Sequence, residues 1–469
     1  MNVREMVESG ASKKISELII KLLDTCSDNT LAQLTFLAEK LTDEEEVLQA
    51  IRSIRAMLRN PEHGLHGLFR RVSEYLPYET KIKLFQSFFN NAWFAGWQKK
   101  KRTLEMHGFW PPFVMILSPT LNCNLRCAGC YTLGYGMRHE LPYELVDKVL
   151  KECEELGIFV ITVLGGEPLV YPHLFRMIEE HPNLMFQVYT NGTLVTRDVA
   201  KRFRELNTIV VISIEGYENE TDQWRGKGVY KKILKAFEHL TEERVLVGSS
   251  STVTRKNAAV VSSDEFLDRM IQLGSLIQMY FLYMPVNGQS DFSLLVTPEQ
   301  RDHLRKKVKE FRQTKPIFLV DFWNDGPHVG GCIAAGRKYF HVNARGDIEP
   351  CVYTHIAVDN VRNTTLREAL MSPLFRAIRE RQPHNENHLR PCMILDNPER
   401  MREIIALTNP RFTHPGAEEI YTIRAKELDE YAQAFAEYID PVWEKEYQSG
   451  VEEAEERIAS YGGCWSGAL

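Results

Sequence analysis

The stretch Leu121-Asn122-Cys123-Asn124-Leu125-Arg126-Cys127-Ala128-Gly129-Cys130-Tyr131 places three cysteines in a C-x3-C-x2-C pattern. Thiolates at this spacing can wrap one loop around three corners of an iron–sulfur cube and leave the fourth iron without a protein ligand. Such an iron can bind a substrate or a cofactor. The same three thiols could instead hold zinc, or pack as small hydrophobic side chains.

The surroundings of the cysteine loop favour the iron–sulfur interpretation. Residues 112–118 form an apolar run that predicts a buried strand. The loop therefore follows the carboxyl end of a strand, the edge at which α/β barrels and open α/β sheets assemble their active sites. The nearest further cysteine or histidine, His139, lies nine positions beyond Cys130. A closed tetrahedral zinc site is therefore the weaker interpretation.

Further motifs follow on successive predicted strands. The strand at 158–164 ends in Gly165-Gly166-Glu167-Pro168, and the strand at 185–189 leads into Thr190-Asn191-Gly192-Thr193. The strand at 208–214 runs into Ser213-Ile214-Glu215-Gly216, followed by Trp224-Arg225-Gly226-Lys227-Gly228. Each motif alone is typical of a turn or a strand end. In this order after the cysteine loop, they resemble the radical S-adenosylmethionine (SAM) superfamily, and the last two resemble its peptide-modifying members.

The resemblance implies a 4Fe–4S cluster on Cys123, Cys127 and Cys130, whose free iron chelates SAM. It also implies reductive cleavage of SAM to a 5′-deoxyadenosyl radical, which abstracts hydrogen from an unactivated carbon. The methionyl amino group is assigned to the GGEP element, the ribose to Ser213 and the methionyl carboxylate to Arg225. Glu215 stands where Asp is usual, which leaves its role open. The implied cofactor-binding residues are Tyr131, Gly165, Gly166, Glu167, Pro168, Asn191, Ser213 and Arg225.

A second group of cysteines lies near the C-terminus. The pattern Cys332-x13-Gly346-x4-Cys351, followed by Cys392, encloses a predicted strand at 339–342 and a predicted hairpin turn at 343–347. It resembles the Twitch or truncated SPASM extension of many radical SAM enzymes, and implies an auxiliary 4Fe–4S cluster on these three cysteines. Cys464 is the candidate fourth ligand. It could equally donate a hydrogen atom to a substrate radical, or have no role.

The strand and helix patterns predict an α/β fold. Residues 106–325 alternate apolar strands with amphipathic helices, and six βα repeats predict a partial (βα)6 TIM-like barrel as the radical SAM core. Residues 1–105 predict a helical N-terminal region. Residues 326–400 predict the Twitch/SPASM-like hairpin with helices, and residues 401–469 predict a helical tail.

Composition agrees with a large enzyme. The chain has 469 residues and is 44% hydrophobic, which permits a sizeable core. Its formal net charge of -6 argues against a nucleic-acid partner. No run of about eighteen apolar residues predicts a membrane span, and the N-terminus lacks the apolar core of a signal peptide. Nine cysteines without a secretory signal favour metal ligation over disulfides. We expect a cytoplasmic protein, and contact with a membrane surface stays open.

The substrate class is less determined. An aromatic-rich segment at 84–97 precedes Lys99-Lys100-Lys101-Arg102, an order that suits a membrane interface, the mouth of a pocket for an acyl or isoprenoid chain, or a helix packed on the barrel. We expect a long apolar substrate, a lipid or an isoprenoid, on which a carbon–carbon bond is formed or altered. The alternative is a peptide or protein maturase. Residues 1–105 show no strand pair of the kind that a peptide-recognition domain needs, which favours the apolar substrate.

A third functional class, the electron donor and the candidate catalytic residues complete the predictions. A non-catalytic iron–sulfur redox sensor is a further interpretation, but a sensor needs neither the GGEP element nor Arg225. A flavodoxin- or ferredoxin-type protein is the expected electron donor. The candidate catalytic residues are Cys464, Tyr283 and Glu215, and the candidate polar groups at late strand ends also include Tyr280, Asn287 and Asp321.

Overall fold

The structure is a computed structural model, and it describes residues 35–36, 39, 45–85, 96–132, 134–135 and 139–448. Cys464 and most of the aromatic segment at 84–97 lie outside these residues.

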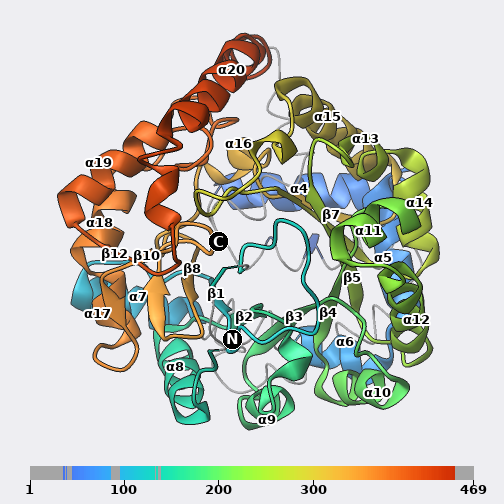
Figure 1. The fold of residues 1–469 in the computed structure, drawn as a ribbon. Coiled ribbons are helices and arrows are strands. Elements are labelled where there is room, and N and C mark those ends of the chain that lie inside the picture. The colour runs from blue at the N-terminus through green and yellow to red at the C-terminus, as the bar shows by residue number, and fades with distance from the viewer. Residues whose placement is uncertain are drawn as a thin grey trace.

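A curved sheet forms the centre of the protein, and helices cover its outer face (Figure 1). In the described residues its ten strands follow the order β11-β9-β8-β1-β2-β3-β4-β5-β6-β7, where β11 is Asp359–Asn360. All neighbours from β8 through β1 to β7 are parallel. The parallel strands are β1 (Val114–Leu117), β2 (Val160–Val163), β3 (Met185–Thr190), β4 (Ile209–Ser213), β5 (Val247–Val253), β6 (Ile277–Leu282), β7 (Phe318–Asp321) and β8 (Tyr339–Val342).

Helices connect the parallel strands on the outside of the sheet, as the sequence predicts for a TIM-like α/β fold. Local signals set their ends: Thr196 caps the start of α10, Thr297 and Gln300 form a capping box on α15, and Gly157 ends α8 in the left-handed conformation. The predicted α/β fold class is confirmed. The parallel part of the sheet is larger than the six predicted βα repeats, because β7 and β8 also belong to it. The connecting helices include α8 (Tyr143–Leu156), α9 (Leu174–Glu180), α10 (Arg197–Leu206), α11 (Glu218–Arg225), α12 (Val229–Glu242), α14 (Asp264–Gln272) and α15 (Pro298–Thr314).

The predicted hairpin of the C-terminal region belongs to the barrel sheet. Strand β8 pairs in parallel with β1, with Val114 opposite Tyr339. Strand β9 (Asp347–Glu349) returns antiparallel to β8, and Gly346 has the positive φ of 83° that the turn requires. The expected boundary at residue 325 therefore falls between two strands of one continuous sheet.

Within residues 45–85 and 96–107, four helices precede the barrel: α4 (Glu45–Arg59), α5 (Gly64–Tyr75), α6 (Tyr78–Phe85) and α7 (Gly96–His107). Helix α5 docks on loops at the N-terminal edge of the sheet, where the Arg71 guanidinium donates to the carbonyl oxygens of Pro316, Ile271 and Ser275 at 2.6 to 3.1 Å. A Cβ on Gly64 would lie 2.4 Å from the Lys315 carbonyl oxygen, so glycine is needed for this approach. No helix in the described ranges is both long and apolar enough to cross a bilayer.

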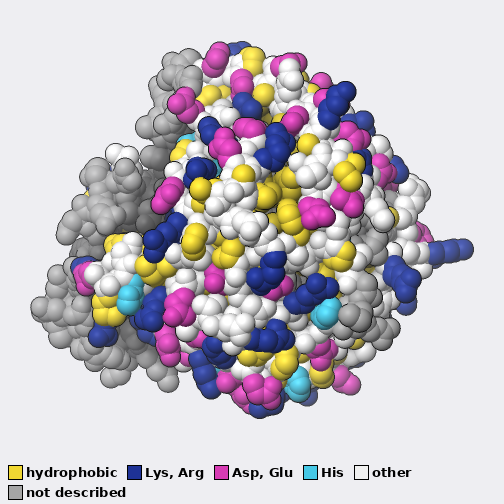
Figure 2. All heavy atoms as spheres, turned by 60° about the vertical axis from the view of Figure 1, so that its left-hand side comes forward, with side chains coloured by type: hydrophobic (Ala, Val, Ile, Leu, Met, Phe, Trp, Pro, Cys, Tyr) yellow, Lys and Arg dark blue, Asp and Glu magenta, His cyan; other side chains and the backbone are white. Residues whose placement is uncertain are grey.

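After the hairpin, the described part of the chain continues in helices. These are α17 (Leu366–Leu370), α18 (Pro373–Arg379), α19 (Pro398–Thr408) and α20 (Ala425–Trp443), and α20 packs against α15 through Phe435, whose ring lies 3.8 Å from the Arg301 guanidinium. On the side of the protein that Figure 2 shows, basic and acidic side chains are interspersed.

Candidate functional site

A cavity of about 790 Å³ lies inside the curve of the sheet. It brings together the sequence motifs that lie far apart in the chain. At the carboxyl ends of the strands its lining includes Cys123, Cys127, Cys130, Tyr131, Gly165, Gly166, Glu167, Asn191, Ser213 and Arg225. All the expected cofactor-binding residues except Pro168, which follows Glu167, therefore face one space.

Nitrogen donors lie beside the thiols of Cys123 and Cys127. Cys123 Sγ lies 3.4 Å from the Leu125 backbone N and 3.9 Å from the Asn191 side-chain N, and Cys127 Sγ lies 4.0 Å from the Arg225 guanidinium. Burial raises the pKa of Cys123 and raises that of Cys127 to about 12, so iron must displace protons to bind. The nearby donors then stabilise thiolates.

The thiols are not arranged around one ion. Among the described residues, no group of three or more His, Cys, Asp or Glu side chains could hold a single metal ion. A mononuclear zinc site needs all its thiolates about 2.3 Å from one ion, whereas an iron–sulfur cube binds each thiolate to a separate iron. The donor set and its spacing therefore fit a cluster.

Glycines allow the cysteine loop to pack closely against its neighbours. A Cβ on Gly165 would lie 2.3 Å from the Thr120 carbonyl oxygen, and one on Gly166 would lie 2.2 Å from the Asn122 carbonyl oxygen. The GGEP turn is thus fixed against the backbone just before Cys123. On the other side, a Cβ on Gly129 would lie 2.7 Å from the ring of Trp224.

The Glu167 carboxylate holds this turn in place through hydrogen bonds. One of its oxygens accepts from Thr190 Oγ1 at 2.7 Å and from the Leu169 backbone N at 3.1 Å, and the other accepts from the Asn191 backbone N at 2.8 Å. Burial raises the pKa of Glu167, although these donors oppose the shift. The carboxylate therefore links the GGEP and TNG segments, and it reaches the cavity with its donors already in place.

Arg225 is held by Glu215. The guanidinium Nε and Nη2 donate to the two carboxylate oxygens at 2.5 and 2.6 Å, and both side chains are largely buried. Burial alone would lower the pKa of Arg225, but Glu215 outweighs it and the pKa is raised. The third nitrogen, Nη1, is directed toward Cys127. Glu215, whose role the sequence left open, thus orients a cation beside the cysteine loop.

A buried chain of hydrogen bonds connects the cysteine loop to the hairpin. Glu349 on β9 contacts His341 Nδ1 at 2.6 Å, and His341 Nε2 contacts Ser118 Oγ at 2.8 Å. Ser118 hydrogen-bonds to Tyr131, whose hydroxyl donates to the Gly165 carbonyl oxygen at 3.4 Å. The chain positions Tyr131, next to Cys130, from the C-terminal region. Sequence reasoning missed it because its members are spread over 232 positions from Ser118 to Glu349.

The second cysteine group also converges. Cys332 lies close enough to perturb the pKa of both Cys351 and Cys392, and burial raises the pKa of each of these two thiols to about 12. The Tyr339 hydroxyl donates to Cys351 Sγ at 2.9 Å, and the backbone N of Ile394 and that of Leu395 donate to Cys392 Sγ at 3.4 Å. Three neighbouring thiols, two of which accept the hydrogen bonds given above, fit an auxiliary cluster. Cys464, the candidate fourth ligand, lies outside the described residues.

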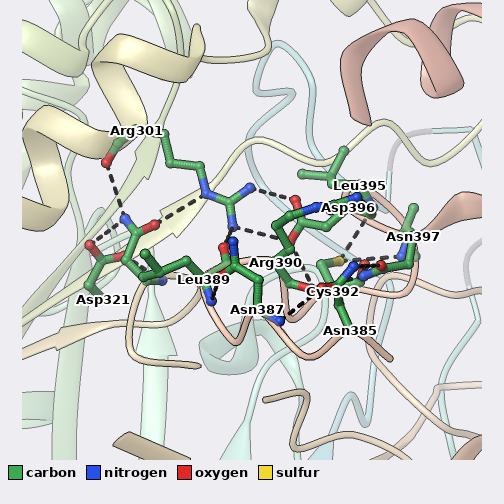
Figure 3. Close-up of polar contacts among 12 residues, drawn as sticks. Arg301, Asp321, Asn385, Asn387, Leu389, Arg390, Cys392, Leu395, Asp396 and Asn397 are labelled. Atoms are coloured by element: carbon green, nitrogen blue, oxygen red, sulfur yellow. Dashed lines mark hydrogen bonds and ion pairs between the residues drawn. The ribbon is translucent and has the colours of Figure 1, made fainter. Parts of the chain in front are cut away.

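Asp396 anchors the loop that carries Cys392 (Figure 3). Its carboxylate accepts from the guanidinium of Arg301 at 2.6 and 3.1 Å and from the backbone N of Cys392 at 3.0 Å. Arg301 and Asp396 are fully buried. Arg301 also donates to Asn324, which follows β7. The loop is therefore tied to the barrel through one buried ion pair.

Of the four candidate polar groups at late strand ends, only Tyr283 lines the cavity, with its ring 6.1 Å from that of Trp224. Tyr280 and Asp321 are buried on the opposite face of their strands and do not line the cavity. Asn287 accepts from Gln289 and Ser290 within its own loop. Tyr280 and Asp321 are therefore corrected as candidates near the reaction centre, because the strand alternation directs both side chains away from the cavity.

The basic run after the aromatic segment is only partly solvated. Lys100 is buried with its ammonium 5.1 Å from the ring centre of Phe113, and Lys99 donates to the Glu154 carbonyl oxygen at 2.7 Å. Lys101 and Arg102 are exposed. Trp97 is 40% exposed and lies 4.7 Å from Trp110.

The barrel with its cysteine-lined cavity and a second cysteine site defines an iron–sulfur enzyme of the TIM-like α/β class. Residues 117–255 match the profile of the radical SAM superfamily, and residues 332–393 match the SPASM iron–sulfur cluster-binding domain. The chain therefore contains a radical SAM domain followed by a SPASM domain. These domains imply a 4Fe–4S cluster with SAM and auxiliary iron–sulfur binding.

Relatives have several activities. The chain is similar to Fe-coproporphyrin III synthase of Methanosarcina barkeri, at 24% identity over 46% of this chain and 57% of that protein, so it spans little more than half of that relative. It is similar to the mycofactocin maturase MftC of Mycobacterium tuberculosis, at 27% identity over 58% of this chain and 73% of the maturase. Among solved structures, SuiB of Streptococcus suis bound to SAM shares the fold, with a TM-score of 0.54 and 17% identity over 63% of this chain and 75% of SuiB.

Proposed function

We propose that this protein removes a hydrogen atom from an unactivated carbon of a long apolar substrate, a lipid or an isoprenoid, with formation or alteration of a carbon–carbon bond. The observation that carries the proposal is the wall of the cavity. Beyond the cysteine loop it consists largely of aliphatic and aromatic side chains, such as Ile116, Met279 and Phe281. An apolar wall of this size binds an apolar ligand by removing both surfaces from water.

Cys123, Cys127 and Cys130 would hold the 4Fe–4S cluster, and Arg225 with Asn191 and the GGEP turn would receive SAM. When both are bound and the cluster is reduced, they supply a 5′-deoxyadenosyl radical. The protein side chains bind and orient: Glu215 fixes the Arg225 guanidinium. The apolar wall excludes water from the space in which a radical must reach its carbon.

Cys332, Cys351 and Cys392 would hold the auxiliary cluster. The described lining of the cavity includes their neighbours Tyr339 and Tyr353 but none of the three cysteines. The Tyr353 ring lies 6.0 Å from that of Tyr131, between the two cysteine sites. This arrangement favours electron transfer or support of the fold over direct contact between the auxiliary cluster and the substrate.

Peptide maturation is the second candidate function, and the relatives favour it. One is named a mycofactocin maturase, and a similar structure is SuiB bound to its precursor peptide SuiA. Another relative is named for a porphyrin product, so these names span more than one substrate class. Within 45–85 and 96–105 the described elements are all helices, so the strand pair expected of a peptide-recognition domain is not found in those ranges.

The test is anaerobic reconstitution and reduction with dithionite, followed by addition of SAM and measurement of 5′-deoxyadenosine with extracted lipids, with a peptide pool, and with neither. Stimulation by lipids alone supports the proposal. Stimulation by peptides alone replaces it with maturation. The Cys123, Cys127 and Cys130 triple alanine variant is the control, and 5′-deoxyadenosine formed by that variant would contradict radical SAM chemistry at this loop.

A further inference from the structure

We propose that the hydrocarbon chain of the substrate lies lengthwise through the barrel, and that a ring of apolar side chains at the N-terminal edge of the sheet limits the length of chain that fits. This inference rests on the proposed function, since it concerns the same cavity. We call these side chains the floor ring; they are Val114, Val160, Met185, Ile209, Ile277 and Phe318.

The first argument is that the barrel is hollow along its length. In a closed TIM barrel, layers of inward side chains fill the interior. In β3 of this protein the inward side chains are not the more buried ones, as they would be in a filled barrel. Met185, Gln187 and Tyr189 point inward and keep exposed surface, whereas Phe186 and Val188 on the helix side are buried. Strands β1, β6 and β7 show the same alternation, and their inward residues line the cavity.

The second argument is the position of the floor ring. Each of its members is the first residue of its strand, so the cavity reaches the edge opposite the cysteine loop. Along β6 the lining extends from Ile277 to Phe281, which is about 13 Å at about 3.3 Å per residue.

The chemistry of the wall changes along this length. Uncharged polar side chains that face the cavity lie farther along the strands, as with Thr162, Gln187 and Thr252, whereas the six side chains of the floor ring are apolar. Lys338, which directly precedes β8, also lines the cavity at this edge. The floor ring itself suits the terminal methylenes of a hydrocarbon chain, because a polar group placed against these six side chains would lose its water without gaining a partner.

The third argument is that helices close this end beside β6 and β7. Leu58 of α4 and Leu65 of α5 belong to an apolar cluster against which Ile277 and Phe318 pack. Arg71 ties α5 to the loop before β7 through the Pro316 carbonyl oxygen. A cavity with a fixed floor discriminates by length, because a chain that is too long must displace packed side chains and one that is too short leaves surface unfilled.

The test uses the full-length reconstituted protein and displacement of cis-parinaric acid by saturated fatty acids that differ by two carbons. Phe318→Ala deepens the cavity, so the preferred fatty acid becomes longer. Val114→Phe makes it shallower, so the preferred fatty acid becomes shorter. Each methylene gained or lost in an apolar contact changes relative affinity about fourfold.

Ile161→Val is the matched control, since Ile161 is fully buried on the helix side of β2 and its truncation leaves the cavity unchanged. Melting temperatures of all variants confirm that they fold. Opposite shifts in Phe318→Ala and Val114→Phe with none in Ile161→Val support the inference. Fatty acids that bind without a shift in preferred length would overturn it while leaving the proposed function intact. Failure of every fatty acid to bind, together with no lipid-stimulated 5′-deoxyadenosine, would remove both.

Discussion

Glu215 and Arg225 show how one residue can place another for a cofactor. The pair is buried and bidentate, and it leaves Arg225 Nη1 directed toward Cys127. A guanidinium is a planar donor that suits a carboxylate, and its orientation matters as much as its charge. We therefore propose that Glu215 positions Arg225 for the binding of SAM, and we do not expect it to touch the substrate.

Replacing Glu215 with Gln should weaken SAM binding about tenfold, because a charge-assisted hydrogen bond contributes about 1.5 to 3 kcal/mol and the neutral amide keeps only part of it. Equilibrium dialysis of the reconstituted protein against labelled SAM measures this loss. Glu218→Gln changes an exposed carboxylate on α11, the helix that carries Arg225, and should leave the affinity unchanged. Equal affinities of the wild-type protein and the Glu215 variant would rule out the positioning role.

Lys100 should make the stability of the protein depend on pH. Burial lowers the pKa of this lysine to about 7, far below its value in the unfolded chain. Between these two values the unfolded state binds more protons, so stability rises with pH from about 7 toward 10, by at most about 1.4 kcal/mol per pH unit. Lys100→Met removes this dependence.

The melting temperature of the reconstituted protein should therefore rise in Lys100→Met, and by more at pH 7 than at pH 9. Lys101→Met, an exposed neighbour on α7, controls for the general effect of charge removal. A gain that is the same at both pH values would show that Lys100 is not desolvated in the folded protein.

At the scale of elements, the loop between Arg390 and Asn397 depends on the Arg301–Asp396 pair. Asp396 accepts from the Cys392 backbone N, and Asn397 donates to the Cys392 carbonyl oxygen at 3.1 Å (Figure 3). Breaking one partner of a buried ion pair costs about 3 to 5 kcal/mol, since the other charge is left uncompensated. The position of Cys392 is thus set from α15, a helix of the barrel.

Asp396→Asn should lower the iron content of the auxiliary site. We would measure it in the background that lacks Cys123, Cys127 and Cys130, where an auxiliary 4Fe–4S cluster alone gives about four irons per chain. Asp440→Asn is the matched control: Asp440 accepts from Arg390 and Asn387 on the same loop but does not contact Cys392. Full iron retention in the folded Asp396 variant would contradict the anchoring role.

The sequence predicted elements that carry local signals. The cysteine spacing, the GGEP and TNG turns and the hairpin around Gly346 are read from a few adjacent residues. The strands predicted at 112–118, 158–164, 185–189, 208–214 and 339–342 lie within two residues of β1, β2, β3, β4 and β8, whereas no strand was predicted at β5. Features that depend on long-range placement could not be read this way. The pairing of β8 with β1 joins residues 225 positions apart. Tyr280, a candidate polar group at a late strand end, lies away from the cavity because one residue of register separates it from cavity-facing Met279.

At the scale of the whole molecule, the C-terminal region completes the barrel rather than extending it. The Lys338 carbonyl oxygen accepts from the backbone N of Phe113 and that of Val114, and the Val342 carbonyl oxygen accepts from the backbone N of Ser118. Without β8, these groups of β1 would lose their partners, and the side of the cavity lined by Tyr339 would open. An exposed parallel edge strand is prone to aggregation.

A chain that ends after residue 325 should therefore lose the iron of its first site as well as that of the auxiliary site. Cys351→Ala separates the two possible causes, because it removes an auxiliary ligand and keeps the β8 strand. We expect the Cys351 variant to retain about four irons per chain on Cys123, Cys127 and Cys130 and to elute as the wild-type protein does. The truncated chain should aggregate and bind little iron. A soluble truncated chain that binds four irons and cleaves SAM would show that the barrel stands without β8, and the buried chain from Glu349 to Tyr131 would then be dispensable for cluster binding.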